Sequence, residues 1–379
     1  MTVKALRTDG FRNLLDGVFT PGDGVNVLYG DNAQGKTNLV EAIWLCTGSR
    51  SFRGARDADM VRLGGRRSAL EMVFEDAGRE QQIRLTLENG RRAELNGIPL
   101  ESPSRLAGEF CAVIFSPEHL GLVKDGPSLR RRFLDGAICQ LMPKYVAAAG
   151  EYRRILTQRN ALLKDIPGHS ELLDTLEVWD DRLSRAGALL VFTRLRYLRR
   201  LEKAAAGFYS GITAGKESLS LRYDGPEYDG GLDDTSGALR AISSTLLREL
   251  AECRAADLEC GYTRTGPHRD DLDVRVNELS ARVFGSQGQQ RSAVLALKLG
   301  EAAVLREKTG EAPVLLLDDV LSELDRGRQD YLLNHIEGQQ VFITCCDPEG
   351  LHGFAGGRAF AIATGRVAES ARLTTGKGE

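Results

Sequence analysis

The sequence predicts an α/β fold in which a Rossmann-like lobe with a β-rich N-terminal part carries a mainly helical inserted second lobe. Two observations lead to this prediction. Short apolar runs occur near both ends of the chain: Val25–Tyr29 is apolar-rich and Val314–Leu317 is fully apolar, and such runs are typical of strands buried on both faces of a sheet. Between these ends, apolar residues recur at helical spacing, as they do in residues 239–250.

The first quarter of the chain has the pattern of short strands and tight turns. Ile83–Leu87 and Ala93–Leu95 flank an Asn89-Gly90 pair, which is a strong β-hairpin signal. Ala112–Phe115 is a further apolar run, and Ser116-Pro117 closes it. We therefore expect a strand-rich N-terminal part.

The pattern becomes helical at about Pro127 and returns to α/β after Gly261. The helical stretch is interrupted by a loop rich in glycine and aspartate, Asp224–Gly237, and the α/β pattern resumes with apolar runs such as Val341–Thr344. We predict one lobe from residues 1–125 and 262–379, and a helical insertion from residues 126–261.

Composition excludes several classes of protein. The 379 residues contain 50 Lys+Arg and 53 Asp+Glu, a net charge of −3, so a uniformly basic nucleic-acid binder is excluded. No apolar stretch approaches the roughly 20 residues of a membrane span, and the N-terminus lacks a signal-peptide layout. The seven cysteines are scattered without metal-binding spacing, which predicts reduced thiols in a cytoplasmic protein.

A phosphate-binding loop of the form G-x-x-x-x-G-K-[ST] follows the first predicted strand directly. Its glycines let backbone N–H groups turn toward a phosphate, Lys36 neutralises phosphate oxygens, and the Thr37 hydroxyl is a Mg²⁺ ligand. The predicted nucleotide-binding residues of the loop are Gly30, Asp31, Asn32, Ala33, Gln34, Gly35, Lys36 and Thr37.

Val314–Leu317 ends in two acidic residues, which is the form of a Walker B strand. We expect Asp318 to hold Mg²⁺ with Thr37, and Asp319 to orient or deprotonate the attacking water. The predicted cofactors are therefore ATP and Mg²⁺, and the predicted catalytic residues are Lys36, Asp318 and Asp319.

Ser286-Gln287-Gly288-Gln289 opens a predicted helix between these two motifs. A serine and free backbone N–H groups at a helix start suit a phosphate, so Ser286, Gly288 and Gln289 are further predicted nucleotide contacts. The segment resembles the signature motif of ATP-binding-cassette (ABC) ATPases, and Ser322–Asp325 follows where that superfamily has its D-loop. This resemblance implies an ABC-type P-loop ATPase head in which the signature of one subunit closes on the ATP of another.

The sequence as a whole resembles the RecF family of bacterial recombinational-repair ATPases, which is related to the heads of SMC proteins. The insertion of about 135 residues is too short for a long coiled coil, since a helix rises about 1.5 Å per residue. The matching stretches cover nearly the whole chain: Phe11–Asn13, Gly30–Ile43, Arg50–Arg53, Phe115–Asp135, Thr265–Asp271, Ser286–Arg291 and Asp318–Asp325.

The resemblance implies an ATP-dependent homodimer that binds double-stranded DNA near single-strand gaps and hydrolyses ATP slowly. It further implies cooperation with the RecR and RecO mediators in loading RecA, and a part in SOS induction. Two features differ from the wider ABC superfamily. Asp319 stands where a glutamate is usual, as in RecF proteins, and the strand at Val341–Thr344 ends without the switch histidine, so that Thr344 becomes a candidate for the γ-phosphate contact.

Local basic clusters are the candidates for DNA contact. The resemblance suggests Arg50 and Arg53 as an arginine loop, and the basic stretch after Val123 suggests Arg130, Arg131 and Arg132. Each cluster is equally consistent with a solvated helix face. A second cluster follows at Arg194, Arg196, Arg199, Arg200 and Lys203.

Other functions remain as alternatives. A head-only SMC- or RecN-like ATPase with another DNA-maintenance role fits the same motifs, although the length of the chain disfavours it. A nuclease or phosphotransferase is disfavoured because no separate carboxylate cluster has metal spacing and the Ser286 motif is foreign to monomeric kinases. A transporter ATPase is disfavoured because the switch histidine is missing.

Overall fold

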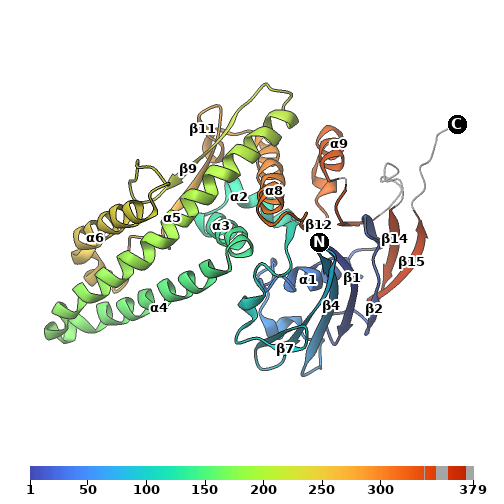
Figure 1. The fold of residues 1–379 in the computed structure, drawn as a ribbon, viewed down its shortest axis with the longest axis horizontal. Coiled ribbons are helices and arrows are strands. Elements are labelled where there is room, and N and C mark those ends of the chain that lie inside the picture. Colours follow the sequence, from blue (N-terminus) through green and yellow to red (C-terminus); the bar gives the residue numbers. More distant parts are fainter. Residues whose placement is uncertain (337, 347–356, 373–379) are drawn as a thin grey trace.

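The computed structural model describes residues 1–336, 338–346 and 357–372. In Figure 1 the long helices lie to the left, the two large sheets lie to the right, and α8 (Gln287–Thr309) runs between them. The two ends of the chain contribute to the same sheet-rich half, because the strands near the C-terminus, β14 and β15, lie beside the N-terminal strands.

A six-stranded sheet forms the centre of the sheet-rich half. Five of its strands run parallel, and β15 pairs antiparallel at one edge. The strands predicted at residues 25–29, 112–115 and 314–317 are confirmed within this sheet. In spatial order the strands are β15 (Arg366–Arg372), β14 (Arg358–Ala363), β3 (Val25–Tyr29), β13 (Val341–Cys345), β12 (Val314–Leu317) and β8 (Ala112–Phe115).

Helix α1 (Lys36–Leu45) shares one hydrophobic core with this sheet and with a second, antiparallel sheet. Alternate residues of the parallel strands enter that core, such as Leu28 and Leu316, while Leu315 and Leu317 face α8 and α9 on the other side. This burial on both faces explains why the strands read as continuous apolar runs. In spatial order the antiparallel strands are β2 (Gly17–Phe19), β1 (Thr2–Asp9), β4 (Ser68–Asp76), β5 (Arg79–Leu87), β6 (Arg91–Leu95) and β7 (Ile98–Pro99).

The remaining helices build the left half of Figure 1, apart from α9, which covers the parallel sheet. The longest is α5, whose 40 residues correspond to about 60 Å. None of the helices in the described part of the chain has the length and apolarity that crossing a membrane requires. The helices are α2 (Pro117–Lys124), α3 (Pro127–Leu141), α4 (Pro143–Asp165), α5 (Leu173–Ile212), α6 (Thr235–Cys260), α7 (Ala281–Phe284) and α9 (Arg326–His335).

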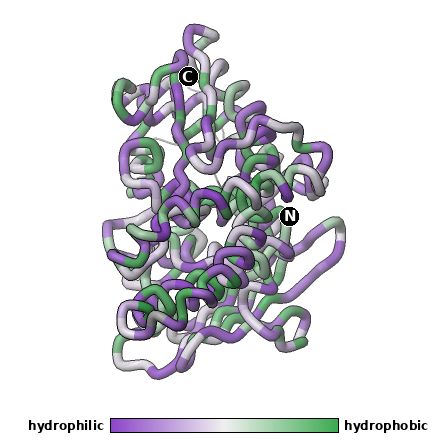
Figure 2. The backbone as a smooth tube through the Cα atoms, turned by 90° about the vertical axis from the view of Figure 1, so that its left-hand side faces the viewer, coloured by the Kyte–Doolittle hydropathy of each residue, from purple (hydrophilic) through white to green (hydrophobic). Residues whose placement is uncertain are grey.

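The helical half includes residues from both sides of position 261. A three-stranded sheet joins β9 (Leu219–Asp224) to β10 (Asp271–Val276) and β11 (Leu279–Ser280), and α8 packs along α5 in a common core. Viewed from the helical side, Figure 2 shows hydrophobic and hydrophilic segments alternating along the chain, as expected for amphipathic helices. We propose two lobes, one formed by residues 1–125 and 262–379 and the other by residues 126–261. In the structure, elements from both sides of the boundary at residue 261 pack together in the helical half.

Candidate nucleotide site

Three sequence segments meet at one edge of the parallel sheet. β3, β13 and β12 are neighbours and run in the same direction, so their carboxyl ends lie together. β3 leads into the loop at residues 30–36, β12 ends at Asp318, and β13 carries Thr344. Parallel pairing therefore brings Thr37 and Asp318 within hydrogen-bond distance, although 281 positions separate them in the chain.

The phosphate-binding loop has the backbone conformation that its glycines allow. Gly30 and Gly35 have φ angles of 141° and 118°, which side-chain-bearing residues rarely adopt. A Cβ atom on Gly30 would also lie 2.4 Å from the carbonyl oxygen of Ile362. The ammonium group of Lys36 donates to the carbonyl oxygens of Gly30 and Asp31, at 2.5 and 2.9 Å, and is thereby held inside the curve of the loop.

Asp318 accepts two hydroxyl hydrogen bonds on the same carboxylate oxygen. Thr37 donates at 2.9 Å and Thr344 donates at 3.0 Å. Burial raises the pKa of Asp318 above its ordinary value, and these two hydrogen bonds partly oppose that shift. The site thus contains adjacent hydroxyl and carboxylate oxygens, which is the ligand chemistry that Mg²⁺ prefers.

A cavity of about 880 Å³ opens over this edge of the sheet. Its wall includes eight residues singled out in the sequence: Asn32, Ala33, Gly35, Lys36, Thr37, Asp319, the γ-phosphate candidate Thr344 and the DNA-contact candidate Arg53. Of the other predicted loop residues, Gln34 accepts a hydrogen bond from the backbone N–H of Thr364 at 2.5 Å, which ties the loop to the β14–β15 turn.

The opposite wall of the cavity contains residues that were not predicted as nucleotide contacts. Arg12, Asn13 and Arg62 belong to the segments that follow β1 and precede β4, and all three line the cavity together with residues of the loop. Asn13 donates to the carbonyl oxygen of Ala33 at 3.0 Å, so this wall is bonded directly to the phosphate-binding loop. The Phe11–Asn13 stretch was visible in the sequence only as part of the family resemblance, and its position depends on long-range packing.

The signature segment lies outside this cavity. Ser286 caps α8, since its hydroxyl accepts from the N–H of Gln289 at 3.2 Å and the Gln289 side chain accepts from the N–H of Ser286 at 2.9 Å. None of Ser286, Gly288 and Gln289 is among the described residues that line the cavity. Ser286 is exposed, so the start of α8 is accessible to another molecule.

Comparison with known proteins gives a consistent assignment. The model of the RecF/RecN/SMC N-terminal domain matches residues 2–355. The DNA replication and repair protein RecF of Acetivibrio thermocellus is 40% identical and that of Symbiobacterium thermophilum 42%, and each comparison covers at least 92% of both chains. The chain belongs to the RecF family.

Solved structures agree with this assignment at the level of the whole RecF fold. A structure of the recombination mediator protein RecF with ATP, in the RecFOR pathway, has a TM-score of 0.90 and 36% identity, covering 98% of both chains. An SMC head bound to a winged-helix domain of ScpA has a TM-score of 0.56 and 14% identity, which shows a shared ABC ATPase head fold only. The predicted fold class is confirmed.

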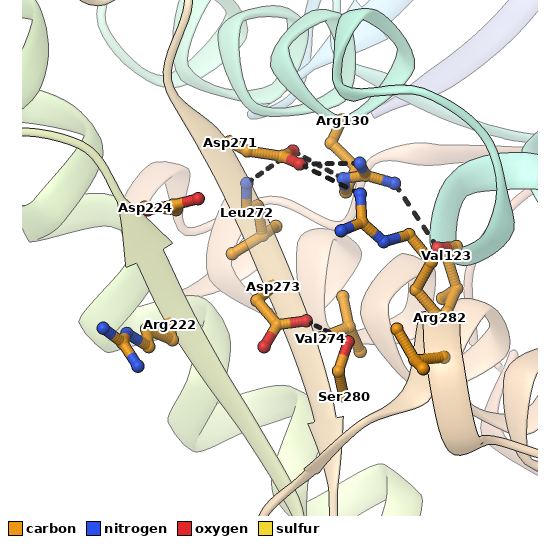
Figure 3. Close-up of a pocket in the computed structure, with 11 residues that line it drawn as sticks. Val123, Arg130, Arg222, Asp224, Asp271, Leu272, Asp273, Val274, Ser280 and Arg282 are labelled. Atoms are coloured by element: carbon orange, nitrogen blue, oxygen red, sulfur yellow. Dashed lines mark hydrogen bonds and ion pairs between the residues drawn. The ribbon is translucent and has the colours of Figure 1, made fainter.

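One predicted DNA contact of this RecF-family chain, Arg130, is buried in an ion pair. The Arg130 side chain is only 2% exposed and donates to both carboxylate oxygens of Asp271, at 2.6 and 2.7 Å. Figure 3 shows the guanidinium group of Arg282 next to that of Arg130, on the same side of the Asp271 carboxylate, and Arg282 lies 3.7 Å from Asp271. Three backbone carbonyl oxygens at the C-terminal end of α2 also accept hydrogen bonds from Arg130. One of the three consecutive arginines therefore has a structural role that the sequence did not reveal.

The other predicted DNA contacts of the RecF-family chain lie in different environments. Arg131 donates to the carbonyl oxygens of Arg269 and Asp270, whereas Arg132 is exposed. Arg50 is exposed as well. Arg53 lines the nucleotide cavity, which makes it a candidate for contact with bound phosphate.

Proposed function

We propose that this protein is an ATP-dependent DNA-binding protein of recombinational repair, in which ATP acts as a switch. The observation that carries the proposal is the hydrogen bond between Thr37 and Asp318, because it joins the Walker A and Walker B motifs into one site. The family membership supports the same function, since the relatives are DNA replication and repair proteins.

ATP and Mg²⁺ fit the residues present. Lys36 and the backbone N–H groups of the loop would hold the β- and γ-phosphates, and Thr37 with Asp318 would hold Mg²⁺. Mg²⁺ would neutralise charge that develops on the phosphates. Asp319 lines the cavity and has a left-handed backbone, φ 52°, fixed by a 2.8 Å hydrogen bond from its N–H to the Thr344 hydroxyl. We assign it the role of orienting the attacking water, with slow hydrolysis because its carboxylate is short.

We propose that the active form is a homodimer in which the α8 start of one subunit meets the nucleotide of the other. Two observations support this. Ser286 is exposed and separate from the cavity of its own subunit. Arg291 on α8 donates to the backbone and side-chain oxygens of Glu323, at 2.5 and 3.0 Å, so the signature helix is bonded to the segment that follows Asp319.

Duplex DNA near single-strand gaps is the proposed polymer ligand, and weak, DNA-stimulated ATP hydrolysis would release it. The solved structure with ATP is that of a recombination mediator protein in the RecFOR pathway, which supports our proposal that this chain cooperates with RecR and RecO. From the family resemblance we further propose a part in loading RecA, a part in SOS induction and a cytoplasmic location. Among the basic residues singled out in the sequence, the exposed ones include Arg50, Arg53, Arg132, Arg196, Arg199, Arg200 and Lys203, and we propose these for phosphate contact.

Sedimentation of three variants with ATP and with ADP tests this function. Wild type and Asp319→Asn should form dimers with ATP and remain monomers with ADP. Ser286→Arg should bind ATP but remain monomeric, and Lys36→Met should lose ATP binding. Normal dimerisation of Ser286→Arg would exclude the signature arrangement, and normal ATP binding by Lys36→Met would exclude the nucleotide site.

A further inference from the structure

A buried carboxylate lies directly behind the nucleotide site. Glu41 is on α1, one helical turn after Thr37, and its side chain is 0% exposed. Arg12 donates to both of its oxygens, with Nε 3.0 Å from Oε2 and an Nη atom 3.2 Å from Oε1. The hydroxyl of Ser51 donates to Oε1 as well. The helix that begins at the phosphate-binding loop therefore anchors two other segments through a single side chain.

The second anchored segment is the arginine loop that follows α1. An Nη atom of Arg53 lies 4.0 Å from Glu41 and donates to the Asn38 side chain at 3.1 Å. The Ser51 hydroxyl accepts from the backbone N–H groups of Arg53 and Ala55, at 3.2 and 3.3 Å. The contact with Glu41 thus fixes both the backbone and the guanidinium group of Arg53.

The two guanidinium groups converge on the nucleotide cavity. Arg12 and Arg53 both line it, together with Lys36 and Thr37. Among Arg12, Arg53 and Glu41, one carboxylate against two guanidinium groups leaves one net positive charge. Arg12 is also held by its left-handed backbone, φ 50°, and by donation to the carbonyl oxygen of Asp59 at 3.1 Å. Guanidinium groups that are already held in place beside a phosphate-binding loop suit a nucleoside triphosphate.

We propose that Glu41 is a positioning residue of the nucleotide site, which holds Arg12 and Arg53 where they meet the bound triphosphate. This inference rests on the proposed function. A buried carboxylate costs free energy unless it is paired. If Glu41 had a purely structural role, it would serve only as the ion-pair partner of Arg12, and it would no longer be needed once Arg12 was replaced by a neutral residue. If Glu41 has a positioning role, its carboxylate should still increase the affinity for the nucleotide after the charge of Arg12 has been removed, because it also holds Arg53.

Calorimetric titration with ATP and Mg²⁺, accompanied by thermal unfolding, separates the two roles. Glu41→Gln should lower both the Tm and the ATP affinity, the latter by about tenfold, which is the usual effect of losing a charged hydrogen bond. The double variant Glu41→Gln/Arg12→Gln removes both buried charges and should recover much of the Tm. Because Arg12 is itself a proposed contact of the triphosphate, the reference for the double variant is Arg12→Gln alone. If Glu41 also positions Arg53, the double variant should bind ATP about tenfold more weakly than Arg12→Gln, and equal affinities of these two variants would overturn the inference.

Asp257 provides a matched control, because it is equally buried and pairs with the buried Arg159 at 2.8 Å in the helical half. Asp257→Asn should lower the Tm without changing ATP affinity. Wild-type ATP affinity in either Glu41 variant would overturn the inference. If wild type and Lys36→Met bound ATP equally, the proposed nucleotide site itself would be wrong, and this outcome is distinct from a failure of Glu41 alone.

Discussion

Thr344 donates its hydroxyl hydrogen to Asp318 at 3.0 Å, across the parallel pair of strands β13 and β12. The same hydroxyl accepts from the N–H of Asp319 at 2.8 Å, so one side chain fixes both acidic residues. The strand that carries Thr344 ends without the switch histidine that is usual in ABC ATPases, which made Thr344 a candidate for the γ-phosphate contact. Its observed contacts point to orientation of the Walker B residues, in addition to the γ-phosphate contact expected from the sequence.

Thr344→Val tests this orientation. Valine has nearly the same shape and the site is buried, with Thr344 2% exposed, so the main change is loss of two hydrogen bonds. Each is worth about 1 kcal/mol, so we expect a five- to thirtyfold fall in ATP hydrolysis and a higher Mg²⁺ requirement. Steady-state hydrolysis over a Mg²⁺ titration measures both effects.

Thr193→Val is a suitable control for that experiment. Thr193 is also buried, but its hydroxyl donates to a backbone carbonyl within α5, at 2.7 Å from Leu189. Its replacement should leave the Mg²⁺ requirement unchanged. If the two valine variants had the same Mg²⁺ dependence as wild type, Thr344 would have no role in orienting Asp318.

Asp318 should destabilise the nucleotide-free protein as the pH rises. Burial raises its pKa in the folded state, so the folded state holds the proton more tightly than the unfolded state. Stability is therefore lost as the pH increases from the unfolded pKa through the raised folded value. Asp318→Asn should match wild type in Tm at about pH 4 and exceed it at about pH 8, while ATP hydrolysis is abolished. An equal Tm difference at both pH values would contradict this account.

The sequence predicted the parallel strands and the Walker residues because their signals are local. A strand buried on both faces is a continuous apolar run, and a phosphate-binding loop has a fixed glycine and lysine spacing. The strands at residues 25–29, 112–115 and 314–317 match the structure in their full extent. The pairing of Thr37 with Asp318 followed from these motifs.

The wall formed by Arg12 and Arg53 could not be predicted from local signals. Their convergence depends on Glu41, which looks like an ordinary polar position in an amphipathic helix but is buried between two sheets. The burial of Arg130 could not be predicted for the same reason, because its partner Asp271 lies 141 positions away in the chain. A charged residue in a sequence does not reveal whether its partner is solvent, ligand or a distant carboxylate.

Arg130 and Arg132 should therefore differ sharply when they are replaced. Arg130→Ala removes the buried guanidinium group that donates to both oxygens of Asp271, leaving this carboxylate only the more distant Arg282, and should destabilise the protein by about 3 kcal/mol. Arg132→Ala alters an exposed side chain and should change the free energy of unfolding by less than about 0.5 kcal/mol. Denaturant unfolding measures both values. Equal, small effects would mean that Arg130 is not held by Asp271 in solution.

The same pair of variants separates folding from DNA contact. Arg132→Ala should weaken duplex binding in the presence of ATP and reduce its salt dependence, because it removes one phosphate contact. Duplex binding by Arg130→Ala should fall only in proportion to the unfolded fraction. Unchanged duplex binding by Arg132→Ala at moderate salt would remove this residue from the proposed DNA surface.

His268 should make the protein sensitive to mild acid. Burial lowers its pKa to about 4, and its ring nitrogens are hydrogen-bonded to the Tyr152 hydroxyl at 2.7 Å and the Thr263 carbonyl at 3.1 Å. Because the folded pKa lies below the unfolded value, the stability that His268 supports above pH 6.5 is lost as the pH falls toward 4. His268→Gln should cost about 1–2 kcal/mol at pH 7.5, and this difference should shrink or reverse at pH 5.

Thermal unfolding of wild type and His268→Gln between pH 5 and pH 7.5 checks this prediction. The pKa of nearby Asp270 is raised by burial to about 6, and its titration acts in the opposite direction, but it is present in both proteins and largely cancels in the comparison. His169 is an exposed control, with 65% of its side chain accessible, so His169→Gln should leave the pH profile unchanged. A pH-independent Tm difference between wild type and His268→Gln would show that His268 is not kept neutral by the fold.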